Sequence, residues 1–254
     1  MPFCNCPLLG FSIEALASAR MDKVYIYASQ SSIEAIKAYI ASAYHDLTMQ
    51  IILRTTTSST IGDVLREADA LQLKTSFLLL RVGYIGNLNL RTYLDQFESK
   101  KTQDASLCMD CLVISSEETA FTSTFLLNPS SRILHYGHAP SFPTRSRWKF
   151  PKELLAENPS VLLRRDLKSI GCWICTADVL PLFTENFDYQ NMHHFIHGIL
   201  TSDLLGKTIS CSEVDNSSSR DTGYATFIQD PSSYATARYV KRRTRIEDIR
   251  ISLH

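Results

Sequence analysis

Three histidines at helical spacing are the first residues of this sequence whose types could do chemistry. They lie in the segment Glu185–Leu200, ENFDYQNMHHFIHGIL, in which His193 and His197 stand one helical turn apart. Two histidines at that spacing bind zinc in metalloproteases, where a glutamate directly after the first one serves as the general base. His194 occupies that position here, so we interpret the three histidines as an exposed helix face.

Four cysteines form two C-x-x-C pairs, Cys108 with Cys111 and Cys172 with Cys175. Two such pairs can hold a zinc ion tetrahedrally. The pairs are about sixty residues apart, whereas zinc sites usually separate them by about 15–20 residues. Each pair also lies in a strand-like run, in which positions i and i+3 point to opposite faces of a sheet. We therefore favour buried core cysteines, and a zinc-dependent binding module stays as an alternative.

A basic run near the end of the sequence could contact the phosphates of RNA. Its members, with Tyr239 among them, are Arg238, Lys241, Arg242, Arg243 and Arg245. The acidic residues Glu247 and Asp248 follow at once, which favours a solvated helix end and tail over a nucleic-acid site.

Composition excludes some classes of protein. The 254 residues hold 26 Lys plus Arg and 26 Asp plus Glu, so the formal net charge is zero. A dedicated binder of nucleic acid or of membrane surfaces would show a basic excess, and a charge near zero favours association with other copies or partners. No apolar run reaches the roughly 18 residues that cross a bilayer, and the first residues do not resemble a signal peptide. Seven cysteines, an odd number, favour a reducing cytosol.

The elements that must position these residues alternate regularly in the first hundred residues. Apolar runs and helical periodicity predict strands at 23–28, 49–54 and 76–82, and helices at 7–20, 31–44, 61–71 and 90–100. Alternation of this kind implies βαβ crossovers and a mostly parallel sheet with helices on both faces.

The second half of the sequence predicts longer strands and a single continuing domain. We expect strands at 107–115, 120–128, 131–137, 167–177 and 224–229, and helices at 178–187 and in the opening segment. Residues 210–223 are polar and predict a loop, after which Asp230 and Pro231 begin a helix. One domain over residues 1–240, with a basic tail over 241–254, is the organisation we expect.

Four blocks of the sequence carry a family resemblance. They are CNCPLLGFSIEALA, STIGDVLREADALQLKTSFLLL, RRDLKSIGCWICTADVLPLFTENFDYQ, and LLGKTIS followed by YATFIQDPSSYATARYV. With these blocks the sequence resembles the epsilon subunit of eukaryotic translation initiation factor 2B, in its N-terminal nucleotidyltransferase-like domain. The segment LFTENFDYQ is the most specific part, and residues 101–160 match only weakly.

The resemblance implies a Rossmann-like, three-layer αβα nucleotidyltransferase fold. Members of that superfamily place a GxGTRL loop before the block that is CPLLGFSIEAL here, and this sequence has too few residues before that block to contain it. The first βα unit is therefore expected to be missing. Because its strand lies centrally in the sheet, its loss would leave unpaired backbone groups on two neighbouring strands, or the sheet would be re-paired.

The resemblance also implies that nucleotidyltransferase chemistry has been lost. The Gly-Thr pair that receives the base corresponds to Thr60-Ile61, the metal-binding Gly-Asp to Val82-Gly83, and the lysine of the Glu-Lys-Pro element falls at about His138. Mg²⁺ held by carboxylates offsets charge in that reaction, so we expect no catalytic residue, nucleotide site, metal site or cofactor. An active sugar-phosphate nucleotidyltransferase whose start has been placed too late is the alternative.

Asn186 and Phe187 are the candidate partner-binding residues. The resemblance implies that this pair contacts translation initiation factor 2, and an exposed aromatic beside an amide suits an interface. From the residues alone, Asn186 could instead cap a helix with Phe187 packed beneath it. The resemblance further implies pairing with a gamma-type subunit. Exchange activity is not expected from this sequence alone, because it holds neither the β-helix nor the helical-repeat domain of the family.

Overall fold

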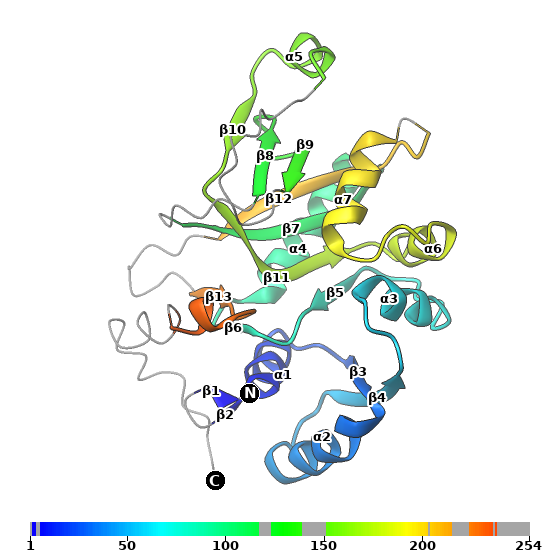
Figure 1. The fold of residues 1–254 in the computed structure, drawn as a ribbon, viewed down its shortest axis with the longest axis vertical. Coiled ribbons are helices and arrows are strands. Elements are labelled where there is room, and N and C mark those ends of the chain that lie inside the picture. The colour runs from blue at the N-terminus through cyan, green and yellow to red at the C-terminus, as the bar shows by residue number, and fades with distance from the viewer. Residues whose placement is uncertain are drawn as a thin grey trace.

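The computed structural model describes residues 2–3, 6–116, 123–138, 151–202, 204–214, 224–235 and 237. Helices lie on both faces of a central sheet, and a smaller sheet with one short helix projects from one end (Figure 1). The tail expected over 241–254 and the basic run that begins at Arg238 lie outside the described residues. Within the described residues, no helix is long and apolar enough to cross a membrane.

The N-terminal half alternates strands and helices as the sequence predicts. Its elements are β1 (Pro2–Phe3), β2 (Cys6–Pro7), α1 (Leu8–Ser18), β3 (Lys23–Ser29), α2 (Gln30–Ala43), β4 (Gln50–Thr56), α3 (Ile61–Asp69), β5 (Phe77–Leu80), β6 (Tyr84–Gly86) and α4 (Leu90–Gln103). Strands β3 and β4 pair in parallel, as a βαβ crossover through α2 requires.

The C-terminal half supplies the longer strands. Its elements are β7 (Leu107–Ser115), β8 (Ser123–Leu127), β9 (Ile133–His138), α5 (Glu153–Glu157), β10 (Leu162–Arg164), β11 (Leu167–Cys175), α6 (Val179–Glu185), α7 (Met192–Thr201), β12 (Thr208–Val214) and β13 (Ala225–Phe227). The four-stranded sheet has the order β12-β7-β11-β5, with β12 parallel to β7 and β11 antiparallel to both of its neighbours. The sheet is therefore mixed, whereas a mostly parallel sheet was expected, and the fold is of the expected α/β type.

Two hydrophobic layers enclose the sheet. On one face, α3, α6 and α7 pack with residues such as Leu65, Phe183 and Phe195 over the buried side chains of β7, β11 and β12. On the other face, α1 and α4 pack through residues such as Ala15 and Phe97. Helices α3, α6 and α7 thus share one side of the molecule, and this neighbourhood positions the Asn186 segment.

An open seam runs between β3 and β5. Within the described residues, β3 pairs only with β4, and β5 only with β11. Nevertheless, Tyr27 of β3 and Phe77 of β5 pack against the same hydrophobic cluster, whereas Val24 and Leu78 share another. Because alternate residues of a strand point to opposite faces, both strands contribute to the same two layers. The two strands therefore lie in the same layer, and among the described residues no ladder pairs them.

The predicted loop over residues 210–223 needs correction. The polar stretch from Ser210 was expected to be a loop, but its first residues form the parallel strand β12. The rest of the expected loop, residues 215–223, lies outside the described residues.

Candidate functional site

The Asn186 segment is a tight loop that joins α6 to α7. Asn186 is the C-cap residue of α6, and its side-chain oxygen accepts a hydrogen bond of 3.0 Å from the backbone N–H of Asp188. The N-cap of α7 is instead Asn191, whose side-chain oxygen accepts from the N–H of His194 at 2.9 Å. The side chain of Phe187 is 74% exposed, so the ring is presented to solvent and does not pack beneath a helix.

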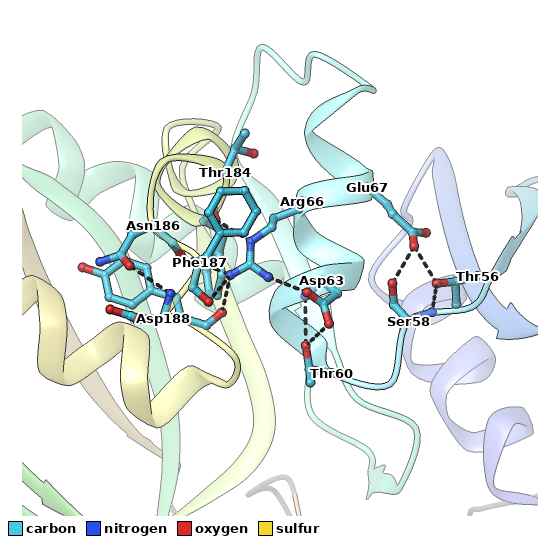
Figure 2. Close-up of polar contacts among 12 residues, drawn as sticks. Thr56, Ser58, Thr60, Asp63, Arg66, Glu67, Thr184, Asn186, Phe187 and Asp188 are labelled. Carbon is cyan, nitrogen blue, oxygen red and sulfur yellow. Dashed lines mark hydrogen bonds and ion pairs between the residues drawn. The ribbon is translucent and has the colours of Figure 1, made fainter.

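Arg66 of α3 binds the backbone of this loop. Its Nε donates to the carbonyl of Phe183 at 2.8 Å, inside the last turn of α6. Its Nη2 lies 3.1, 2.9 and 3.1 Å from the carbonyls of Asn186, Phe187 and Tyr189 respectively (Figure 2). The last carbonyls of a helix lack partners within it and carry partial negative charge, so a cation placed there is well matched. One side chain thus donates to four carbonyls, one in the last turn of α6 and three in the loop that follows.

Asp63 holds Arg66 in this position. Its carboxylate accepts a 2.6 Å bond from Nη1 of Arg66, whose side chain is only 12% exposed. Thr60, the N-cap of α3, accepts from the N–H of Asp63 at 3.1 Å and donates to its other carboxylate oxygen at 2.7 Å. The sequence Thr-x-x-Asp therefore acts as a capping pair that also orients the arginine.

Gly62 brings the first turn of α3 directly against the loop. Its N–H donates to the carbonyl of Gln190 at 3.0 Å. A Cβ at this position would lie 1.9 Å from the carbonyl oxygen of Tyr189, so only glycine permits this approach. Helix α3 thus holds the loop at two points one turn apart, through Gly62 and Arg66.

Aromatic side chains support the loop from below. The rings of Phe183 and Phe195 stack with centroids 4.6 Å apart, and Tyr189 meets them edge-on at 5.9 and 5.4 Å. All three side chains are buried. The absence of a side chain at Gly198 admits the Tyr189 ring, because a Cβ there would lie 2.3 Å from it. This packing fixes the loop beneath the exposed Phe187.

The three histidines of the segment do not converge on a metal. His193 stacks on His138 with centroids 3.8 Å apart, and its Nδ1 is hydrogen-bonded to the hydroxyl of Tyr136. Burial, with nearby His138, Arg81 and His194, lowers the pKa of His193 to about 4. The side chain of His193 is half-buried, which corrects the expectation of a surface residue. No three His, Cys, Asp or Glu side chains among the described residues could hold a metal ion.

The cysteine pairs are core residues. Cys108, Cys111, Cys172 and Cys175 are all buried, and burial raises the pKa of each thiol. Cys172 and Cys175 border different hydrophobic clusters, as their spacing predicts, but Cys108 and Cys111 border the same one. A thiol that burial keeps protonated is a poor zinc ligand.

The end of β5 does not fit a magnesium ion. Val82 and Gly83 provide no carboxylate there, and a Cβ at Gly83 would lie 2.4 Å from the carbonyl oxygen of Ile228. The adjacent Arg81 lies over the ring of Phe227, 4.7 Å from its centroid, and burial lowers the pKa of this guanidinium. A cation thus lies beside the position at which the resemblance places a metal-binding carboxylate.

Asn186 and Phe187 are candidates predicted from the sequence, whereas the residues that hold their loop were not predicted. Arg66, Asp63 and Gly62 fall in one of the four blocks, yet an Asp and an Arg three positions apart in a helix resemble an ordinary surface pair. The glycine was the stronger signal, because glycine inside a helix usually has a packing reason.

Comparisons with known proteins give relatives over most of the chain. No family model matches the sequence. The translation initiation factor eIF2B subunit epsilon of Schizosaccharomyces pombe is 32% identical over 232 residues, covering 83% of this chain and 33% of that protein. The subunit epsilon of Dictyostelium discoideum is 30% identical over 222 residues, covering 83% and 31%. The chain thus spans about a third of the length of these curated relatives.

Solved structures share the fold at low identity. A Bacillus anthracis protein described as a glucose-1-phosphate thymidylyltransferase superposes with a TM-score of 0.69 at 11% identity, over 95% of this chain and 85% of that chain. For a UDP-glucose pyrophosphorylase the TM-score is 0.64 at 15% identity, over 96% and 90%. At such identities the likeness shows the fold alone. With the sequence relatives, it identifies the chain as an eIF2B-epsilon-like domain of the nucleotidyltransferase type.

Proposed function

We propose that this chain is a non-catalytic domain of the exchange factor for translation initiation factor 2, and that it docks this factor through Asn186 and Phe187. The observation that carries the proposal is an aromatic ring, 74% exposed, on a loop whose backbone is held by Arg66 and Gly62. An aromatic residue pre-positioned on a rigid loop loses little entropy on binding, which suits an interface anchor. In this proposal the chain takes part in translation initiation by docking the factor. We also propose that the protein is located in the cytosol.

The docking role is tested by capture of purified initiation factor 2 on immobilised chain carrying Asn186→Ala and Phe187→Ala. Capture falls strongly if the pair anchors the factor. A matched control is Val82→Ala, because Val82 is another exposed apolar residue, 56% accessible, outside the loop. Undiminished capture by the double variant would refute the docking role.

The chain also pairs with a gamma-type subunit in this proposal. The edge strand β10 supports this pairing, because Leu162 and Leu163 are 52% and 51% exposed. Neighbouring residues face opposite sides of a strand, so both faces of β10 present an exposed leucine. Such an apolar edge is normally covered by a partner. Co-purification with a gamma-type subunit should fail for Leu162→Glu with Leu163→Glu. Full co-purification of that variant would exclude β10 from the pairing.

The non-catalytic part of the proposal has its own support. The residues at the end of β5 offer no carboxylate for a metal, and the Thr60 hydroxyl is engaged with Asp63 at the N-terminus of α3. A working pyrophosphorylase needs charge stabilisation at the triphosphate. Turnover of a sugar phosphate with a nucleoside triphosphate and Mg²⁺ above the level of a heat-denatured sample would favour the active-enzyme alternative. Zinc analysis of the purified protein tests the metal-module alternative.

A further inference from the structure

A groove lies beside the Asn186 segment, between the end of α6 and the helix α7. Its volume is about 1090 Å³. Leu182, Tyr189 and Leu205 supply its apolar lining and pack against the main hydrophobic core. Glu185 and Asp188 line it as well, and both are exposed. The groove is thus an apolar recess, continuous with the core, with two carboxylates at its margin.

The two carboxylates are not neutralised by nearby basic groups. Arg66 is engaged with Asp63 and four carbonyls, and Lys207 pairs with Asp178 at 2.7 Å. Among the described residues, neither Glu185 nor Asp188 forms an ion pair. The margin therefore carries two carboxylates without an ion pair, beside an apolar surface and the rings of His194 and His197.

Leu204 adds an apolar group at the same groove. Its side chain is 98% exposed, so it gains nothing from the fold of this chain. A fully exposed leucine beside an apolar recess is typical of a surface that a partner covers. Phe187 lies on the loop that forms one wall, so a partner bound there could contact both residues.

We propose that this groove binds a segment of a protein partner in which a large apolar side chain is flanked by Lys or Arg. The apolar side chain enters the recess against Leu182 and covers Leu204, while the basic groups approach Glu185 and Asp188. Charge complementarity selects this occupant, because nucleic acid and other polyanions are repelled by the two carboxylates. The proposal rests on the proposed function, since it assigns the segment to initiation factor 2.

The test measures the affinity of the full chain for purified initiation factor 2, at about 50 mM and about 300 mM salt. The variant Glu185→Lys with Asp188→Lys should bind about tenfold more weakly at low salt and lose most of the salt dependence. Leu204→Ser should weaken binding about fivefold at both salt concentrations. Matched controls outside the groove are Glu34→Lys and Leu155→Ser, which change exposed residues of α2 and α5 and should leave binding unchanged.

The outcomes separate the groove from the docking role. If Phe187→Ala weakens binding but the groove variants bind like the parent chain, the groove proposal is wrong and the docking role stands. If Phe187→Ala also has no effect, both are wrong. If sedimentation shows that the chain self-associates and that Leu204→Ser abolishes it, the groove serves a second copy and the proposal is again overturned.

Discussion

The guanidinium of Arg66 lies over the ring of Phe187, 5.0 Å from its centroid. The same guanidinium binds the carbonyl of Phe187 at 2.9 Å and is paired with Asp63. Helix α3 therefore contacts both the ring and the backbone of Phe187 through Arg66, although the two residues are more than a hundred positions apart in the chain. A cation within about 6 Å of a ring face attracts it, so Arg66 also restrains where the exposed ring points.

Replacing Arg66 by alanine should lower the free energy of unfolding by about 3 kcal/mol, because the partly buried carbonyls of Phe183 and the loop lose a charged donor. Arg66→Lys should recover only part of this, since an ammonium cannot reproduce the planar set of donors. Chemical denaturation monitored by circular dichroism measures both variants.

The control for this prediction is Arg91→Ala. Arg91 forms an exposed ion pair with Asp95 one turn along α4, at 3.1 Å, and its side chain is 54% exposed. Such a pair contributes at most about 0.5 kcal/mol. Equal losses for Arg66→Ala and Arg91→Ala would show that Arg66 does not hold the loop.

Gly62→Ala should destabilise the protein by about 3 kcal/mol, because the added methyl would overlap the carbonyl of Tyr189. The sign of the change in stability is informative, because replacing glycine by alanine in an open helix interior stabilises a protein by up to about 1 kcal/mol. Gly206→Ala is the comparison: its methyl meets no atom within 4 Å, and only its φ of +55° is strained. A stabilising effect of Gly62→Ala would mean that α3 and the loop are not in contact.

Stability should fall as the pH drops from about 6.5 towards 4, because His193 is held neutral in its stack with His138. Its pKa is lowered from 6.5 to about 4, so over this interval the unfolded chain takes up a proton that the folded chain does not. Above pH 6.5 neither state is protonated there, and below about 4 the loss is complete. Urea denaturation at a series of pH values measures the slope of the unfolding free energy against pH.

His193→Gln should reduce this slope without removing it. Burial also lowers the pKa of His135 and of His138, so both contribute in the same direction. An unchanged slope in His193→Gln would indicate that the stack does not persist in solution.

The buried carboxylate of Asp110 should make β12 sensitive to Lys100. Asp110 is 1% exposed and accepts hydrogen bonds from Ser210 at 2.8 Å, Ser212 at 2.7 Å and Lys100 at 3.1 Å. Lys100→Met should cost about 3 kcal/mol in unfolding free energy, because an uncompensated buried charge remains. Adding Asp110→Asn to that variant should restore part of the loss, and no recovery would contradict the pairing.

The sequence was sufficient for most elements because their apolar periodicity is local. Strand β12 was not predicted because Ser210 and Ser212 are polar and resemble loop residues. Their hydrogen-bond acceptor in the strand is Asp110, about a hundred positions earlier, which no local pattern reveals. The short strand β10 was missed similarly, because its exposed Leu162 and Leu163 lack the alternation that marks a strand with one buried face.

The candidate site was only half predictable. Asn186 and Phe187 were identified through a family resemblance, but no local pattern reveals that Arg66 reaches their carbonyls across the fold. The half-buried His193 was likewise misassigned to the surface, since its partner His138 comes from strand β9 and not from its own helix. Long-range contacts of this kind are fixed by tertiary packing and not by sequence spacing.

The affinity of Phe187→Ala for purified initiation factor 2 is the most direct test of the docking role. With the fold confirmed by an unchanged unfolding midpoint, the variant should bind at least about thirtyfold more weakly than the parent chain, as the loss of an interface anchor implies. Binding of Phe187→Ala as tight as that of the parent chain would contradict a docking role for the Asn186–Phe187 loop.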